Sequence, residues 1–223
     1  MQSAAAVHRD ALATPAGEPL FSSAHAALTF AFNHTAQVYD RPLMARLASK
    51  PRPGGGKGLG GTDGAGQAGM ILAKMDQLTE LHQLIILARF LPQTACCSHC
   101  GSDAWDADWL AVIRKISDAA MLHGVLSGHI IHRAVRDALV MRYFANKANR
   151  KRILLGTIAA KAGISDRTVT DQNSKIVLWL KGSRFTKAGK GQLAAGQKGE
   201  DARAMERVEA ALVAAGMIGT DED

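Results

Sequence analysis

The stretch that decides the fold of this chain is Ile153–Leu180, ILLGTIAAKAGISDRTVTDQNSKIVLWL. Its first part predicts a short helix that includes Ile158 and Ala159. A tight turn is expected next, because Gly163 tolerates a positive φ without a Cβ clash. Ser165 predicts the start of a second helix, since its hydroxyl can accept a hydrogen bond from a free backbone N–H group of the first turn. The stretch therefore predicts a helix-turn-helix.

The second helix of this pair has two distinct faces. Val169, Ile176 and Leu180 recur at helical spacing, so we expect them to pack on the first helix. The residues left on the outer face have the position from which a recognition helix meets base edges in the major groove of DNA. We predict that these DNA-binding residues are Arg167, Thr168, Thr170, Asp171 and Lys175.

Positive charge is concentrated around this pair of helices. From Arg133 to Lys198 the chain has 15 lysines and arginines and three acids, a net charge of +12; since the whole chain carries +7, the remainder carries −5. Basic residues that flank a groove-reading helix can neutralise phosphates and make binding strongly salt-dependent. The alternative is a solvated basic surface on an ordinary helical protein. The residues expected to hold phosphates are Arg150, Lys151, Arg152, Lys161 and Lys175.

The composition predicts an all-α protein. Of the 223 residues, 47% are hydrophobic and only 5% aromatic. Alanine is abundant and the alternation typical of strands is almost absent, which favours helices over sheet. No apolar run approaches the roughly 20 residues of a membrane span, and residues 1–20 lack the charged and apolar regions of a signal peptide. We therefore expect a cytoplasmic protein without a membrane partner.

Changes in composition along the chain predict four segments. Apolar residues at three- and four-residue steps predict helices within them, at residues 24–33, 43–49, 70–90, 105–121, 130–144 and 202–215. The segments are a disordered N-terminus (1–22), a helical domain (23–145) with a Gly-rich loop (51–69) and a Cys loop (96–101), a helix-turn-helix region with a long second helix (146–182), and a basic connector followed by a C-terminal helix (183–223).

The three cysteines lie together in the sequence CCSHCG. Cys97 and Cys100 are spaced as in a zinc knuckle, and Gly101 would ease the backbone around the metal. A structural zinc normally has four ligands, and the sequence offers no second cysteine pair. Bound zinc is therefore one interpretation, and reduced buried thiols or a reactive thiol near a helix N-terminus are the alternatives. The remaining candidate ligands are Cys96, His129 and His132.

No arrangement of residues typical of an enzyme stands out. Asp103, Asp106 and Asp108 lie at the start of a predicted helix, where carboxylates interact favourably with the helix dipole. The glycines before Lys57 lack the preceding strand and the following Ser or Thr of a P-loop. We expect no catalytic residues, and no cofactor apart from the zinc considered above.

The segment IAAKAGISDRTVTDQNSKIVLWL resembles the region-four helix-turn-helix of bacterial sigma factors. Asn173 departs from that pattern, which prefers an apolar residue facing the first helix, and so does Asp171, an acid on the exposed face. The matching residues are Ile158, Ala159, Gly163, Ile164, Ser165, Arg167, Thr168, Val169, Lys175 and Leu180.

The order of further segments is similar to phage-encoded late-transcription regulators, namely prophage antiterminators of the Q type and related sigma-like activators. The resemblance implies a sequence-specific regulator that binds double-stranded DNA near a late promoter and engages host RNA polymerase. The alternative is a protein- or RNA-interaction module that uses the basic surface without sequence-specific DNA binding. The segments are GLGGTDGAGQAGMI (58–71), CCSHCGSDAWDADWLAVI (96–113) and RDALVMRYF (136–144).

Overall fold

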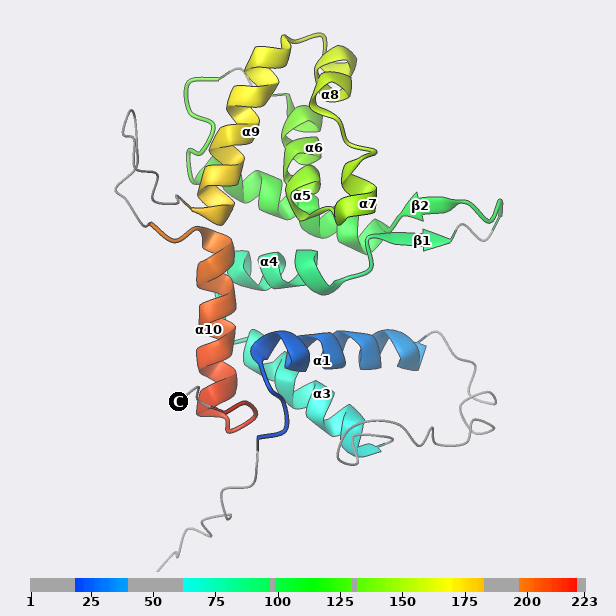
Figure 1. Ribbon diagram of the computed structural model, residues 1–223, viewed down its shortest axis with the longest axis vertical. Coiled ribbons are helices and arrows are strands. Elements are labelled where there is room, and N and C mark those ends of the chain that lie inside the picture. The colour runs from blue at the N-terminus through cyan, green and yellow to red at the C-terminus, as the bar shows by residue number, and fades with distance from the viewer. Residues whose placement is uncertain (1–18, 40–61, 97–98, 130–131, 183–196, 220–223) are drawn as a thin grey trace, which may run out of the picture.

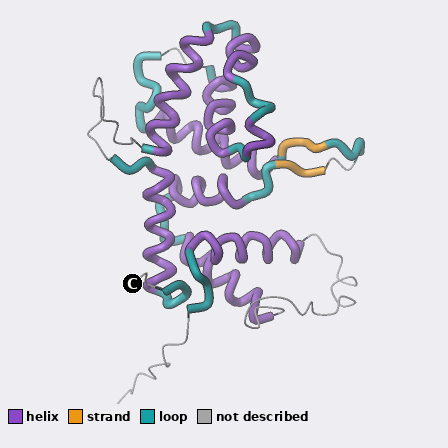
Figure 2. The backbone as a smooth tube through the Cα atoms, viewed as in Figure 1, coloured by secondary structure: helices purple, strands orange, loops and turns teal. Residues whose placement is uncertain are grey.

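The computed structural model describes residues 19–39, 62–96, 99–129, 132–182 and 197–219. The protein is mainly helical, as its composition predicts, and its described strands form one two-stranded sheet (Figure 1, Figure 2). None of the described helices is long and apolar enough to cross a membrane.

The N-terminal layer consists of α1 (Ala24–Tyr39) and α3 (Thr62–Met75), which pack against each other. Their buried faces combine small residues with large ones, among them Ala27 and Leu28 of α1 and Ala68 and Ile71 of α3. These two helices form the lower layer in Figure 1.

The Gly-rich loop predicted at residues 51–69 is wrong in its second part. The residues before Thr62 lie outside the described ranges, but those that follow form the first half of α3. Each glycine in a helix costs about 1 kcal/mol relative to alanine. Burial of Ala68, Ile71 and Met75 against neighbouring helices offsets that cost. The helix predicted at residues 43–49 lies outside the described part.

The prediction of a single helix at residues 70–90 is also wrong, because α3 ends at Met75 and a second helix, α4 (Glu80–Phe90), begins after a short turn. The side chain of Gln83 donates hydrogen bonds to the backbone carbonyls of Asp76, at 3.3 Å, and Leu78, at 3.0 Å. These bonds close the link between α3 and α4. The apolar residues keep helical spacing across the break, so periodicity alone does not reveal it.

A β-hairpin includes most of the loop predicted at residues 96–101. Its strands β1 (Thr94–Cys96) and β2 (Asp103–Trp105) pair in antiparallel fashion. The hairpin projects from the side of the helical body (Figure 2). Trp105 ends a strand, and does not begin the helix predicted at residues 105–121.

The next helix, α5 (Ala107–Leu122), begins one residue after Asp106. The Asp106 carboxylate accepts a hydrogen bond from the backbone N–H of Trp109 at 2.9 Å, so this acid caps the helix, as its position at a predicted helix start indicates. Trp109 is fully buried, and its indole N–H donates to the carbonyl of Ala88 at 3.0 Å. Trp109 thereby fixes α5 against α4.

The upper layer in Figure 1 is completed by the helices α6 to α9 and by the upper part of α10. Of these, the short helix α7 was not expected from the sequence. The last helix of the chain contacts α9 and α4 above and α1 and α3 below, so it joins the two layers. The bounds are α6 (Arg133–Phe144), α7 (Lys147–Arg150), α8 (Leu155–Ala162), α9 (Asp166–Lys181) and α10 (Glu200–Ala214).

The prediction of a disordered segment at residues 1–22 is wrong at its end, because residues 19–22 belong to the described fold. Phe21 is buried, and its backbone N–H donates to the carbonyl of Met217 at 3.2 Å. It forms a parallel bridge with Ile218, and its ring lies 5.3 Å from that of Phe30. An isolated aromatic residue has no periodicity, so the sequence pattern gives no sign of this contact.

The backbones at the end of α9 and the start of α10 lie very close together. Gly182 and Lys198 form an antiparallel bridge. A Cβ atom on Gly182 would lie 2.3 Å from the carbonyl oxygen of Gln197, and one on Gly199 would lie 2.2 Å from that of Leu180. Glycine is therefore required on both sides of this crossing. The basic connector predicted from residue 183 lies outside the described residues up to residue 196.

Candidate functional site

The turn between α8 and α9 is set by local chemistry, at the residues that the sequence indicates. Gly163 has φ 65° and ψ 30°, the left-handed conformation, at the end of α8. The N–H of Ile164 donates to the carbonyl of Ala159 at 3.1 Å, which closes the last turn of that helix. The Ser165 hydroxyl then accepts a hydrogen bond from the N–H of Thr168 at 3.1 Å and caps α9.

The inner face of α9 holds the helix against the protein. Val169, Ile176 and Leu180 are fully buried, as predicted. The fourth buried residue is Gln172, also at 0% exposure, whereas Asn173 is only half-buried. The spacing of three and four residues along α9 places Gln172 on this inner face, so one of its buried side chains is polar.

The outer face of α9 presents three of the five predicted DNA-binding residues to solvent. Arg167, Thr170 and Asp171 are exposed within the first two turns. The Thr170 hydroxyl donates to the backbone carbonyl of Asp166 at 2.8 Å, which holds this side chain along the helix. Arg167 and Asp171 extend a positive and a negative group from the same end of α9.

The other two predicted residues of α9 are half-buried and have partners inside the protein. The Thr168 hydroxyl lies 2.8 Å from that of Ser165, at the cap of the helix. Lys175 donates to the backbone carbonyl of Ser127 at 3.2 Å, so its ammonium group links α9 to the segment after α5. The structure thus gives both side chains a position within the fold that the sequence does not show.

The short helix α7 is anchored by Gln93, just before the hairpin. The Gln93 side-chain oxygen accepts from the Asn146 N–H at 3.0 Å and from the Asn149 side chain at 3.1 Å, while its nitrogen donates to the Phe144 carbonyl at 2.9 Å. The Asn146 side chain also caps α7 by accepting from the Asn149 N–H at 2.8 Å. This network fixes the direction of α7 and of the exposed basic residues Lys147, Arg150 and Lys151.

The segment between α7 and α8 is held by Arg142 of α6. Its guanidinium donates to the backbone carbonyls of Ile153 and Arg150. Desolvation by burial, together with the nearby charge of Arg150, lowers the pKa of Arg142 below its ordinary value. The contact holds the segment that carries Lys151 and Arg152 against α6.

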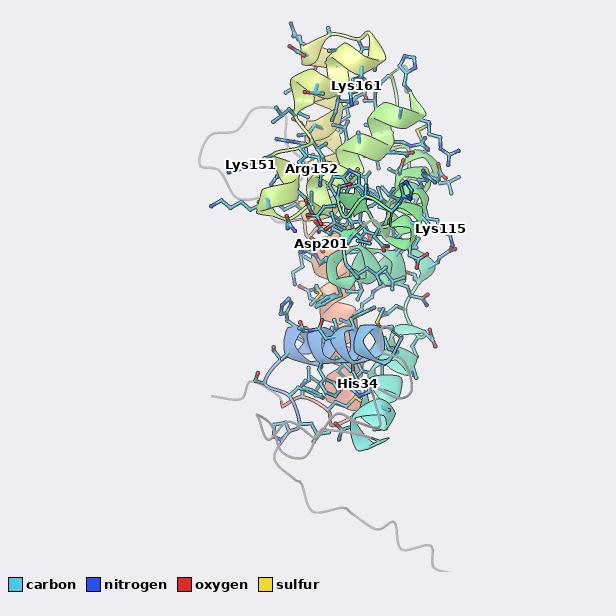
Figure 3. The ribbon with its side chains drawn as sticks, turned by 90° about the vertical axis from the view of Figure 1, so that its right-hand side faces the viewer. His34, Lys115, Lys151, Arg152, Lys161 and Asp201 are labelled. Carbon is cyan, nitrogen blue, oxygen red and sulfur yellow. The ribbon has the colours of Figure 1, made fainter. Side chains whose placement is uncertain are left out.

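Three of the four predicted phosphate-binding residues outside α9 lie on one side of the molecule. Arg150, Lys151, Arg152 and Lys161 are all exposed. Figure 3 shows Lys151, Arg152 and Lys161 on the side from which this view is taken. The guanidinium carbon of Arg152 lies 5.0 Å from the centroid of the Trp105 ring, a cation–π contact that holds the charge in place.

An open groove of about 250 Å³ lies between α6 and α8, on this basic side. Its charged lining residues are Arg152 and Lys161, and its lining includes no acid. Neither the groove nor the Arg152–Trp105 contact has a signal in the sequence pattern, because both bring together residues far apart in the chain. The apolar lining includes Val135, Ala138, Met141, Ile158 and Ala162.

Two of the three cysteines lie at exposed positions of the hairpin. Cys96 and Cys100 are exposed, and Cys97 lies outside the described residues. The Cys96 thiol donates to the carbonyl of Gly101 at 3.4 Å, and the Cys100 sulfur lies 2.8 Å from the Ser102 hydroxyl. Among the residues that the structure describes, no group of three or more His, Cys, Asp or Glu side chains is placed to hold a metal ion.

The two histidines considered as further zinc ligands lie far from these cysteines. The hairpin precedes the N-terminus of α5, whereas His129 and His132 follow its C-terminus (Figure 1). A helix rises 1.5 Å per residue, so the 16 residues of α5 separate the two ends by about 24 Å. The structure therefore does not bring together the cysteine and histidine pairs.

No protein family, curated protein or solved structure matches this chain. The case for a function therefore rests on the chain's own residues. The features that carry it are the exposed first turns of α9 and the basic side formed by α7, α8 and the segment between them.

Proposed function

We propose that the protein is a sequence-specific DNA-binding transcription regulator that places the N-terminal turns of α9 in the major groove. The observation that carries this proposal is the division of α9 into two faces. Val169, Ile176 and Leu180 are fully buried, while Arg167 and Asp171 are exposed near the helix start. A helix fixed on one side and polar at its exposed start is suited to reading base edges.

Each exposed residue has a chemical counterpart on a base pair. Arg167 can donate two hydrogen bonds to O6 and N7 of guanine, the commonest specific contact in the major groove. Asp171 can accept a hydrogen bond from N4 of cytosine, so its negative charge would select that base and oppose close approach of a phosphate. Together the two side chains favour a site that contains guanine and cytosine within a few base pairs.

The exposed cations before α8 supply the sequence-independent part of binding. Arg150 and Lys151 extend from α7 and the residue that follows it, next to the α8–α9 pair. Lysine and arginine in such positions neutralise phosphates and release counterions, which makes affinity fall steeply with salt. The resemblance to sigma-like activators and Q-type antiterminators supports host RNA polymerase as a second partner and a late promoter as the place of action.

The experiment that tests this function is selection of bound duplexes from a random DNA pool at about physiological salt. Arg167→Ala should lose about 1–3 kcal/mol of affinity for the enriched sequence and should relax the preference at one base position. Arg114→Ala is the matched control, since Arg114 is an exposed arginine on α5. It should keep the enriched sequence.

Two results would contradict the proposal. Salt-sensitive binding to DNA without an enriched sequence would remove the base-reading role of α9. Binding to RNA with none to duplex DNA would favour an interaction module that uses the same basic surface.

A further inference from the structure

The groove between α6 and α8 has an apolar floor that is left open. Three small residues, Ala134, Ala138 and Ala162, line it, and their short side chains leave the space unfilled. Leu154 also lines it and is 54% exposed, so a large apolar side chain of the lining faces solvent. An apolar hollow beside an exposed leucine indicates a surface that is covered by a partner.

The rim of the groove carries charge of one sign. Arg152 and Lys161 both line it, and both are exposed. Contact with the Trp105 ring, 5.0 Å away, holds the Arg152 guanidinium at the edge of the groove. No acid lines the groove, so its lining offers these two cations no counterion. A ligand that enters the groove therefore meets two positive charges.

The size of the groove limits what fits. Its volume is about 250 Å³, below the roughly 300–1,000 Å³ of most small-molecule pockets. This space accommodates one or two large apolar side chains, and the groove is open to solvent, so such a side chain can enter it from a segment at the surface. Charged groups on either side of such an anchor would then face Arg152 and Lys161.

We propose that this groove binds an acidic segment of a partner protein, which inserts a bulky apolar side chain between α6 and α8 and places carboxylates against Arg152 and Lys161. Charge complementarity carries the choice of partner, because two fixed cations beside an apolar floor match an apolar residue flanked by Asp or Glu. Carboxylates also accept the paired hydrogen bonds that a guanidinium donates.

This binding is separate from DNA reading by α9. In this proposal Arg152 and Lys161 bind the peptide. Arg150 and Lys151, which do not line the groove, bind the phosphates. The protein would then hold DNA and a protein segment through different side chains. Failure of one proposal leaves the other intact.

The test is selection of random 12-residue peptides, displayed on phage, on the immobilised full-length protein. Enriched peptides should combine a Leu, Ile, Phe, Met or Trp with two or more acids within three positions. Their dissociation constants are then measured by fluorescence anisotropy on purified variants. Thr157→Glu places a negative charge on an exposed position of the groove lining, and should weaken binding at least about tenfold.

Further variants test the same peptide binding, so the conclusion does not depend on Thr157→Glu alone. Arg152→Ala and Lys161→Ala should each weaken the peptides about tenfold, while Lys181→Ala, which removes an exposed cation at the end of α9, should leave them unchanged. Arg167→Ala should also leave peptide binding unchanged.

Several outcomes would overturn the proposal. They are the absence of enriched peptides, enrichment of neutral or basic peptides, and peptide binding that Thr157→Glu and Arg152→Ala do not affect. Arg152→Ala and Lys161→Ala could instead lose affinity for all duplex DNA and keep peptide binding unchanged. That result would assign both residues to phosphate binding.

Discussion

The guanidinium of Arg152 stacks over the ring of Trp105, 5.0 Å from its centroid, although the two residues lie 47 positions apart in the sequence. Trp105 in turn stacks on Trp109, with ring centroids 5.5 Å apart. The contact fastens the segment before α8 to the end of the hairpin. It therefore couples the position of the basic side to the packing of α5.

This coupling can be measured by a double-mutant cycle. We expect Arg152→Ala and Trp105→Leu to show an interaction energy of about 0.5–1 kcal/mol in urea unfolding, the usual worth of an exposed cation–π contact. Arg150→Ala combined with Trp105→Leu is the control and should be additive within error. Equal coupling for Arg150 would show that general electrostatics, and not the stacked geometry, links these residues.

Lys151 tests the proposed phosphate contacts. We expect Lys151→Ala to weaken binding to specific and random duplexes by the same factor, because a phosphate contact carries no sequence information. The slope of log K against log salt should become shallower by about 0.9, as one counterion fewer is released. Arg114→Ala should leave the slope unchanged. A loss confined to the selected sequence would assign Lys151 to a base.

The close crossing at Gly199 makes a stability prediction. Its φ of −75° and ψ of 168° are acceptable to alanine, so the effect of Gly199→Ala comes from the Cβ atom placed 2.2 Å from the Leu180 carbonyl oxygen. Since backbone must move, we expect a loss of about 2 kcal/mol or more in the free energy of unfolding. Circular dichroism during urea unfolding measures it.

A second glycine provides the matched control. Gly66 lies within α3 and has no atom within 4 Å of the position of an added Cβ. Gly66→Ala should therefore stabilise the protein by about 0.5–1 kcal/mol, because alanine is the better helix former. A destabilised Gly66→Ala would contradict the assignment of these residues to a helix.

Tyr143 predicts how stability changes at high pH. Burial, with the adjacent Asp201 carboxylate that accepts its hydrogen bond at 2.7 Å, raises the pKa of Tyr143 above its ordinary value. Asp201 also accepts both hydrogen bonds from Arg89 and is buried, so the folded state keeps this phenol neutral. Its contribution is fully present below about pH 10, the ordinary pKa of tyrosine, and falls as pH rises above it.

The measurement is the urea midpoint of the protein and of Tyr143→Phe at pH 8 and at pH 11. The variant should lose about 1 kcal/mol at pH 8, where the hydrogen bond is missing. Its further decline toward pH 11 should be smaller than that of the unaltered protein. Parallel declines would show that other groups govern the alkaline transition.

The sequence predicts the α8–α9 pair because its determinants are local. Gly163 supplies a positive φ, Ser165 caps the second helix, and Val169 begins the buried face. These effects act over a few residues, so a single stretch contains all the information that they need. Asp106 is likewise predicted at a helix start, although the predicted start at residue 105 lies two residues before the observed one, so its role as the cap comes from the structure.

The remaining features depend on tertiary contacts, so the pattern of residues along the sequence does not predict them. The glycines around Gly66 favour a loop by propensity, yet packing of α3 against α1 makes them helical. The anchoring of α7 by Gln93 joins residues more than 50 positions apart. The groove arises only when α6 and α8 are placed side by side. No local period encodes any of these.

The antiparallel bridge between Gly182 and Lys198 is a non-covalent link between the end of α9 and the start of α10. The two backbone segments meet at this bridge, and the glycines there leave no room for a side chain between them. A protease cut between residues 183 and 196 would therefore leave two fragments that stay associated through this crossing and through the contacts of α10 with α4 and α9. We expect the chain to divide there into a long fragment with all residues of the α8–α9 pair and a short complementing fragment with α10.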